Sequence, residues 1–382
     1  MAAGAFSAYV RTDPVAAMPP PLLNRGVWGW MREHLFGSKL NIALTLLSLL
    51  VIWWIVPPLL NFLIFDATWS GSDRTACIAT PDRPRVGACW AWAFERINFF
   101  VYGFYPATQR WRVDIFFSLL AFGIVWLLAF WAPFKKAAVI YFFVALPILS
   151  ILFLLGFPPL GLSYVSTSLW GGILVTIVVS AVGIVFSLPI GVVLALGRRS
   201  KMPVVRLLSV IFIEFVRGVP LITVLFMASV MLPLFVPESW SPDKLLRALI
   251  GVAMFAAAYM AEVVRAGLQS VPRGQYEGAQ ALGLSYWKMM GLIILPQALK
   301  VTIPNIVNSN IALFKDTTLV FIVGIFDFLR TIEAARIDPK WATPVTSTTG
   351  YAFAAIFYFL CCWMMSRYAR DVERRLATGY KR

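Results

Sequence analysis

Apolar segments of about 20 residues recur along the chain, and shorter segments rich in Arg, Lys, Pro and Gly separate them. A helix rises about 1.5 Å per residue, so each apolar segment is long enough to cross a hydrocarbon core of about 30 Å. The strict alternation of apolar and polar residues that marks a membrane β-barrel is absent. Because backbone groups inside lipid must be bonded within the protein, the pattern predicts an all-α integral membrane protein.

Eight segments have the length and character of transmembrane helices, and the seventh contains a polar interruption. They lie at 42–65, 115–132, 137–157, 169–197, 204–235, 246–266, 298–328 and 351–365. The first forty residues are rich in Pro, Ala and Arg and lack the apolar core of a signal peptide, so we expect a tail on the cytoplasmic side. The polar segment 66–113 separates the first two spans, and its tryptophans suit a membrane interface. These are Trp69, Trp90, Trp92 and Trp111.

The composition supports a membrane protein, with 60% hydrophobic and 13% charged residues. Lys and Arg number 33 against 18 Asp and Glu, an excess that also occurs in nucleic-acid-binding proteins. Here the basic residues are dispersed around the spans and form no single face, so we expect no nucleic-acid partner. Basic residues of a membrane protein mark the loops on the cytoplasmic side.

Every second loop is basic, which orients the spans. The basic residues of these loops are Arg25, Arg32, Lys39, Lys135, Lys136, Arg198, Arg199, Lys201, Arg265, Arg273, Lys288, Arg367, Arg370, Arg374, Arg375, Lys381 and Arg382. With these loops inside, both termini are cytoplasmic and 66–113 is periplasmic. Cys77 and Cys89 form a disulfide if that loop is periplasmic, whereas Cys361 and Cys362 lie in a span as packing thiols. His34 is the only histidine and no metal-binding spacing occurs.

One cytoplasmic loop, 269–288, differs from the others because it is long and contains helix-forming residues. Pro272 and Gly274 break the incoming span, Glu277 falls early in a new helix, and Gly283 permits a turn before the next helix. The pattern predicts a short helix across the membrane surface. Such a helix is either an ordinary surface helix or one that docks in a groove of a soluble partner and moves both attached spans.

The loop resembles the conserved cytoplasmic loop of bacterial ABC-importer permeases, in which a Glu-Ala-Ala triplet precedes a Gly and later a Leu-Pro. The matching residues are Glu277, Gly278, Ala279, Gly283, Leu295 and Pro296. The segments 215–220, 258–265, 274–275, 295–299 and 315–319 resemble the polar amino-acid subfamily, and the resemblance covers about 170–370. Gly278 replaces the usual first Ala, which costs up to about 1 kcal/mol of helix propensity. The additional N-terminal spans resemble the long subunits of general L-amino-acid importers.

The resemblance implies four regions: a cytoplasmic tail at 1–40, three N-terminal spans at 41–160, an ABC permease core at 161–370 and a cytoplasmic tail at 371–382. It also implies the bacterial inner membrane and a permease that is not itself an enzyme. The partners would be a cytoplasmic ATPase dimer that binds ATP and Mg, a second, paralogous permease and a periplasmic amino-acid-binding protein. No Gly-x-x-x-x-Gly-Lys-Ser/Thr phosphate loop occurs in the chain, so ATP must be hydrolysed elsewhere. The ATPase-coupling residues would be Gly274, Gln275, Tyr276, Glu277, Gly278, Ala279 and Gly283.

Ionisable and polar groups inside spans are costly and are therefore candidates for contacts with an amino-acid substrate. The candidate pathway residues are Arg217, Asn308, Lys315, Asp316, Thr317 and Thr318. We expect 315–318 to interrupt the seventh span and to expose N–H groups at the start of a helix from 318 to 329. An internal ion pair between Lys315 and Asp316 is the alternative, and for Glu262 and Arg265 a pair on one helix face is favoured.

Two other functions are compatible with parts of the pattern. An ATP-independent secondary transporter would need no ATPase and no Glu277. A membrane-embedded enzyme would need a nucleophile motif or a pair of catalytic groups, and His34 alone does not supply one. The function that the resemblance implies, and that we predict, is a permease subunit that forms half of an alternating-access pathway for polar L-amino acids.

Overall fold

The structure is a computed structural model that describes residues 26–81, 83–237 and 242–376. The chain divides into two compact units, Met1–Ala67 and Thr68–Arg382. The first unit contains α1 (Gly26–His34), α2 (Lys39–Leu60) and η2 (Asn61–Phe65). Helix α2 begins after Ser38, whose hydroxyl oxygen accepts a hydrogen bond from the N–H of Asn41 at 3.1 Å. Together α2 and η2 form one apolar candidate span. None of the residues in its most hydrophobic stretch is buried inside the protein.

The second unit begins with a folded polar segment and two spans. Its first elements are η3 (Arg74–Cys77), α3 (Trp90–Glu95), α4 (Ile97–Tyr102), η4 (Ala107–Gln109), α5 (Arg110–Leu128), α6 (Lys135–Ile140), η5 (Tyr141–Ala145), α7 (Leu146–Leu155), η6 (Pro158–Leu160) and η7 (Thr167–Leu169). The remaining elements are α8 (Gly172–Arg198), α9 (Pro203–Gly218), α10 (Leu221–Phe226), η8 (Met227–Met231), α11 (Leu232–Phe235), α12 (Lys244–Ser270), α13 (Arg273–Ala281), α14 (Tyr286–Met289), η10 (Met290–Ile294), α15 (Leu295–Asp316), η11 (Thr317–Val323), β1 (Phe326–Asp327), α16 (Phe328–Ala335) and α17 (Pro344–Leu376).

The described residues contain seven helices that are long and apolar enough to cross a membrane, or eight if one bent pair counts as a span. The eight expected spans match this larger number. The segment 204–235, however, is not one straight span, because α9 and the helix from Leu221 to Phe235 meet at 108°. Pro220 causes the break: the residue before a proline avoids the helical conformation, and Val219 is extended with φ −113° and ψ 136°.

The polar segment 68–106 is folded and packs against the start of α17. Cys77 and Cys89 are joined by a disulfide, and the N–H of Cys89 donates to Thr349 Oγ1 at 2.9 Å. Trp92 is fully buried, and its ring lies so near Gly350 that a Cβ there would be 3.1 Å away. An interfacial position is therefore wrong for Trp92 and for the buried Trp90, although Trp69 and Trp111 are about half exposed. Trp90 and Trp92 are instead part of the core of the folded segment.

Spans α5 and α7 pack into the same hydrophobic cluster as α8, α10 and α12. Val113, Phe116 and Leu154 belong to this cluster together with Leu174 and Leu225, all buried. The compact units thus divide the chain between 67 and 68, and the functional boundary expected at 160/161 stays a prediction.

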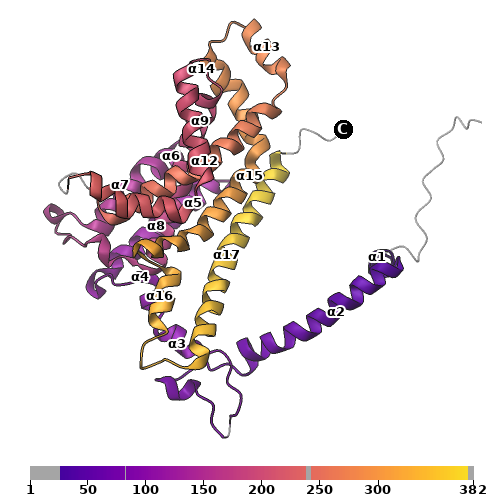
Figure 1. The fold of residues 1–382 in the computed structure, drawn as a ribbon, viewed down its shortest axis with the longest axis vertical. Helices are drawn as coiled ribbons and strands as arrows, with labels where there is room; N and C mark the ends of the chain where they lie inside the picture. The colour runs from indigo at the N-terminus through magenta and orange to yellow at the C-terminus, as the bar shows by residue number, and fades with distance from the viewer. Residues whose placement is uncertain (1–25, 82, 238–241, 377–382) are drawn as a thin grey trace, which may run out of the picture. The chain divides into compact units, whose positions relative to one another are not determined.

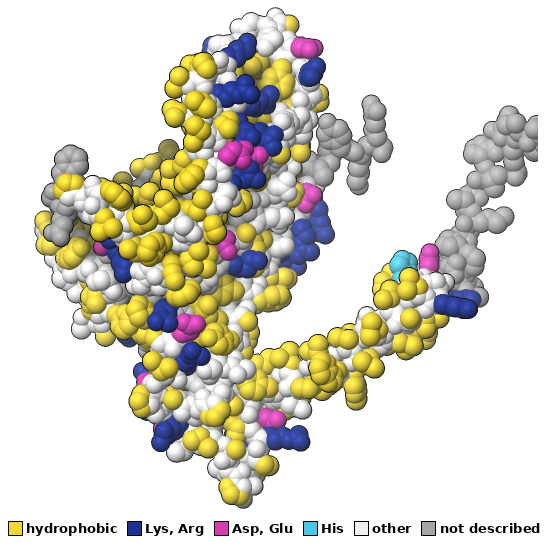
Figure 2. Space-filling model, in the orientation of Figure 1, with side chains coloured by type: hydrophobic (Ala, Val, Ile, Leu, Met, Phe, Trp, Pro, Cys, Tyr) yellow, Lys and Arg dark blue, Asp and Glu magenta, His cyan; other side chains and the backbone are white. Residues whose placement is uncertain are grey.

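Helices α8 and α12 form the centre of the second unit, and α15 lies between α12 and α17 (Figure 1). Glycine allows the closest approach: a Cβ on Gly191 of α8 would lie 2.8 Å from the Cβ of Met260 on α12. Figure 1 places α13 and α14 at one end of this unit and α3 and α16 at the opposite end. Hydrophobic side chains cover much of the surface between these ends (Figure 2), as expected for a face in contact with lipid.

Candidate functional site

Helix α13 is a short helix with well-formed ends, as the sequence predicts. Pro272 precedes its first residue, and Gly283 after its end has a φ of +68°, which glycine adopts without strain. The N–H of Gly283 donates to the carbonyl of Gln280, and the N–H of Leu284 donates to the carbonyl of Ala279. These two bonds are the Schellman arrangement that ends a helix. Helix α13 therefore ends sharply, and the chain makes a turn before α14 begins.

One face of α13 is fastened to the neighbouring spans. The hydroxyl of Tyr276 donates to the carbonyl of Leu268 on α12 at 3.0 Å and accepts from Arg199 Nη1 at 3.1 Å. The guanidinium carbon of Arg199 also lies 5.6 Å from the centre of the Tyr276 ring. Gln275 accepts a hydrogen bond from Gln297 on α15 at 3.0 Å. With Ala279 buried between them, these contacts tie α13 to α12, α15 and the end of α8.

The opposite face of α13 is open. Glu277 is exposed, and a Cβ placed on Gly274 or Gly278 would meet no atom within 4 Å. Leu282, directly after the helix, is 77% exposed. Glu277 is the fifth residue of α13, so the expectation that it lies early enough to meet the positive end of the helix dipole is wrong. The carboxylate of Glu277 instead lies on an exposed face of α13, where the neighbouring glycines have no side chains.

A cluster of charged side chains joins α8, α9 and α12 near the same end of the unit (Figure 2). Its centre is Glu262, which pairs with Arg198 at 2.9 Å, Arg265 at 2.8 Å and Arg217 at 3.7 Å. Arg198 also pairs with Glu214 on α9 at 2.7 Å. The pair expected between Glu262 and Arg265 is confirmed. The side chain of Glu262 is 16% exposed, so these interactions are screened less than those of surface pairs.

Arg217 belongs to this cluster. Its guanidinium carbon also lies 5.7 Å from the ring centre of Tyr259. Gly218 and Pro220 follow it at the 108° bend. Arg217 is therefore held by residues of α12, and a role in the substrate pathway stays a prediction.

The segment 315–318 does not begin a new helix. Helix α15 continues to Asp316, and a 3₁₀ helix, Thr317–Val323, follows it without an opening in the backbone. The expectation of a helix from 318 to 329 with free N–H groups is wrong, because Gly324, with φ +72°, turns the chain before α16 starts. Thr317 is buried and donates to the carbonyl of Phe314, while Thr318 donates to that of Lys315.

Lys315 and Asp316 form no ion pair in the part of the chain that the structure describes. Lys315 is exposed and Asp316 is half-buried. Asn308, two turns earlier on α15, is exposed as well. The structure thus places three polar candidates on one helix, and none of them is paired with the charged cluster of Glu262. In residues 26–81, 83–237 and 242–376, no group of His, Cys, Asp and Glu has the arrangement of a metal site.

Comparisons with known proteins identify the architecture. Residues 187–378 match the family described as binding-protein-dependent transport system inner membrane component. The chain is 49% identical over 353 residues to the inner membrane amino-acid ABC transporter permease protein YhdY of Escherichia coli (strain K12), covering 92% of this chain and 93% of that one. The chain belongs to the family of amino-acid ABC transporter permeases.

Two further relatives show how the permease compares with long and short members. It is 40% identical over 98% of its length to the glutamate/glutamine/aspartate/asparagine transport system permease protein BztC of Rhodobacter capsulatus, 99% of which is covered. It is 34% identical over 54% of its length to the glutamate/aspartate import permease protein GltK of Escherichia coli O6:H1, of which 92% is covered. The permease therefore matches BztC along nearly the whole of both chains, whereas its match to GltK covers only about half of its own length.

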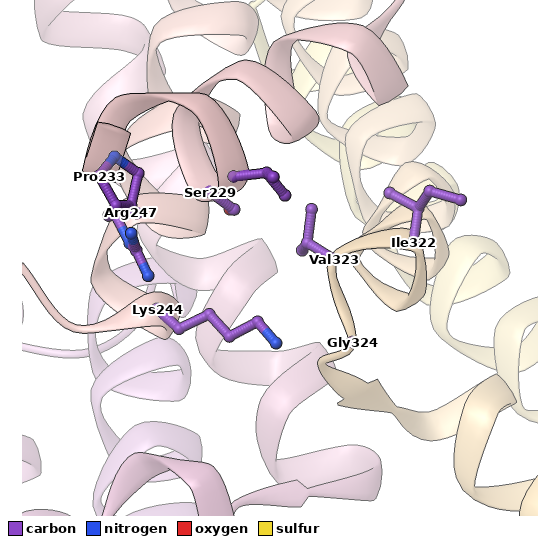
Figure 3. A pocket seen from close by; sticks show the side chains of 8 residues that line it. Ser229, Pro233, Lys244, Arg247, Ile322, Val323 and Gly324 are labelled. Atoms are coloured by element: carbon purple, nitrogen blue, oxygen red, sulfur yellow. The ribbon is translucent and has the colours of Figure 1, made fainter. Parts of the chain in front are cut away.

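Sequence reasoning missed one feature of the permease, a pocket lined by Ser229, Lys244 and Arg247 (Figure 3). The signal was present. Lys244 and Arg247 lie three residues apart at the start of a span whose preceding loop was expected outside, where basic residues are normally few.

Proposed function

We propose that the permease forms half of an alternating-access pathway that imports polar L-amino acids, and that α13 couples it to a cytoplasmic ATPase. One observation carries the proposal: α13 has one face tied to three spans and an opposite face that is open and carries Glu277. A partner protein that binds the open face would therefore move α13 together with the spans to which it is attached. A surface helix without a partner would not need both properties.

The contacts of α13 define a route for movement. Tyr276 joins it to Arg199 at the end of α8 and to α12, and Gln275 joins it to α15. The cluster around Glu262 then links α8, α9 and α12 at the same end. A displacement of α13 would therefore be shared among the helices that meet there. The hydrophobic cluster that includes Ala279 supports such rigid coupling because packed side chains resist compression.

The family supplies the remaining parts of the proposal. ATP and Mg would bind to a separate ATPase dimer, a second permease would complete the pathway, and a periplasmic binding protein would deliver the amino acid. The names of YhdY and BztC refer to amino-acid transport, which supports this substrate class. With α13 facing the ATPase, both termini are cytoplasmic and the disulfide-bonded segment 68–106 is periplasmic.

Asn308, Lys315 and Asp316 remain our candidates for the substrate pathway, together with Thr317 and Thr318. Their support is the unusual presence of charged and amide groups on α15, a candidate span, where Lys315 and Asp316 do not neutralise each other. Thr317 is buried and bonded to the backbone, which favours a structural role for its hydroxyl.

Purification of the tagged permease from its native membrane in mild detergent tests the proposal. We expect an ATPase with a phosphate loop and a second permease to copurify, and the complex to move amino acids into proteoliposomes only with ATP and the binding protein. Recovery of the chain alone, with amino-acid transport that needs no ATP, would establish a secondary transporter instead.

A further inference from the structure

A pocket of about 720 Å³ opens between the second half of the bent pair, the start of α12 and the end of η11 (Figure 3). Its volume is in the range of about 300–1,000 Å³ that is usual for small-molecule sites. The lining residues come from four elements of the second unit and the turn after η11. They are Ser229, Val230, Pro233, Lys244, Arg247, Ile322, Val323 and Gly324.

Two cationic side chains of one helix turn face this pocket. Figure 3 shows the side chain of Lys244 reaching toward Gly324. A Cβ on Gly324 would lie 2.9 Å from Lys244 Nζ, so a larger residue there would displace the ammonium group. Arg247 follows one turn later on α12. None of the described lining residues is acidic, and no ion pair neutralises either cation among the described residues.

Three polar atoms of the pocket residues lack a hydrogen-bond partner although they are buried. They are Nε and Nη1 of Arg247 and Oγ of Ser229. Ser229 is only 5% exposed, so its hydroxyl has no ready access to bulk water. A buried polar atom without a partner costs about 1–3 kcal/mol, and more when it carries charge. An anion in the pocket would supply acceptors for the guanidinium and the hydroxyl and would relieve the repulsion between the cations.

The pocket lies at the end of α12 opposite to α13. Helix α12 has 27 residues, so its ends are about 40 Å apart, and α13 follows its last residue after two positions. If α13 is cytoplasmic, the pocket faces the periplasm, from which an imported substrate enters. Basic residues are disfavoured on that side of a bacterial inner membrane, which indicates a function for Lys244 and Arg247.

We propose that this pocket binds the two carboxylates of a dicarboxylic L-amino acid such as glutamate as it enters the permease. The inference rests on the proposed function, since it gives the substrate class and an entry site for that import. Two cations, with no acidic residue among the described lining residues, favour a ligand with net negative charge over a zwitterion. The planar guanidinium of Arg247 suits one carboxylate, the ammonium of Lys244 suits the other, and Ser229 supplies a hydroxyl.

The test uses the purified transporter with its partner subunits in lipid nanodiscs, and measures equilibrium binding of radiolabelled L-glutamate and L-glutamine without ATP or binding protein. The variants are Arg247→Gln, Lys244→Gln and Ser229→Ala. Arg206→Gln on α9 is the matched control, because Arg206 is an exposed arginine outside the pocket. In parallel, ATP-driven uptake of both amino acids is measured in proteoliposomes that contain the binding protein.

We expect Arg247→Gln and Lys244→Gln to weaken glutamate binding at least tenfold and glutamine binding less than threefold, with a smaller loss for Ser229→Ala and none for Arg206→Gln. Unchanged glutamate binding in the two cation variants, with ATP-driven uptake intact, would overturn the pocket assignment alone. If these substitutions weakened the binding of glycerol phosphate but not that of glutamate, the pocket assignment would also be overturned. That result would identify a lipid headgroup as the occupant. Absence of ATP-driven uptake of any amino acid by the parent transporter would overturn the proposed function instead.

Discussion

The hydroxyl group of Tyr276 on α13 accepts a hydrogen bond from Arg199, and Arg199 immediately follows the last residue of α8. The two residues are 77 positions apart in the sequence. Arg199 and Tyr276 both donate to the same acceptor, the carbonyl of Leu268 on α12. Three helices thus meet at one phenol group. This arrangement makes Tyr276 the most direct link between α13 and the spans.

Removal of this hydroxyl should weaken the coupling without unfolding the protein. Tyr276→Phe keeps the ring under Arg199 but loses a hydrogen-bonded group worth about 0.5–1.5 kcal/mol. We expect ATP-driven uptake to fall about two- to tenfold while ATP hydrolysis by the complex changes less. Tyr286→Phe is the matched control, because the exposed Tyr286 packs against Trp287 and its hydroxyl has no hydrogen bond among the described residues. Equal uptake by both variants would contradict the role of Tyr276.

Glu262 should be more important for stability than an ordinary acidic residue. Glu262→Gln leaves Arg198, Arg217 and Arg265 without their shared carboxylate, and we expect a loss of about 1–3 kcal/mol in unfolding free energy. The measurement is the apparent melting temperature in detergent. Glu333→Gln, which breaks an i,i+3 pair with Arg330, should cost under about 0.5 kcal/mol. A larger loss of unfolding free energy for Glu333→Gln than for Glu262→Gln would contradict the special importance of Glu262 for stability.

Asp327, which precedes α16 outside the candidate spans, should make stability depend on pH. It is fully buried, and burial raises its pKa from 3.8 to about 7 although it accepts hydrogen bonds from the N–H groups of Leu329 and Arg330. Because the folded pKa lies above the unfolded value, the stabilisation is complete below about pH 4 and is lost as the pH rises through about 7.

We therefore expect the melting temperature of the parent protein to fall between pH 4 and pH 8, and that of Asp327→Asn to fall less. Asparagine also caps helix N-termini, so the substitution keeps the start of α16. Asp243→Asn, at the exposed N-cap of α12, is the control. Its melting temperature should fall with pH as much as that of the parent. A slope that is the same in Asp327→Asn and the parent would contradict the account.

The disulfide between Cys77 and Cys89 should stabilise the folded segment 68–106. It joins two residues that are 12 positions apart, for which restriction of the unfolded chain is worth about 2–4 kcal/mol. In a background with Cys361 and Cys362 replaced by Ala, we expect maleimide to label the protein only after reduction. Cys77→Ser and Cys89→Ser should lower the melting temperature equally, alone or combined. Labelling without reduction would contradict the bond.

The sequence was sufficient to predict features that depend on local composition. Span positions follow from runs of apolar residues, and the ends of α13 follow from Pro272 and Gly283, whose backbone preferences act locally. The disulfide followed from the placement of two cysteines in one loop expected to be periplasmic. In these cases a few neighbouring residues decide the conformation.

Features that depend on distant residues were not predictable. Trp92 is buried because α17 offers Gly350 against its ring, which no local pattern reveals. Arg217 pairs with Glu262, 45 positions away, because α9 packs against α12. The polar run at Lys315 and Asp316 indicated a helix break, but the tertiary packing continues the turn as a 3₁₀ helix. The pocket forms only where four elements meet, so that Ser229 and Arg247 line one space.

The most direct test of the coupling role of α13 is a comparison of two charge reversals on exposed glutamates. Glu277→Lys changes the open face of α13, and Glu373→Lys changes the exposed end of α17. The measurement is ATP-driven amino-acid uptake, with the amount of each variant in the membrane and the amount of copurified ATPase determined in parallel. We expect Glu277→Lys to abolish uptake and reduce the copurified ATPase although the protein inserts normally, and Glu373→Lys to retain uptake within twofold of the parent. Uptake by Glu277→Lys equal to that of Glu373→Lys would contradict the claim that α13 couples the permease to ATP hydrolysis.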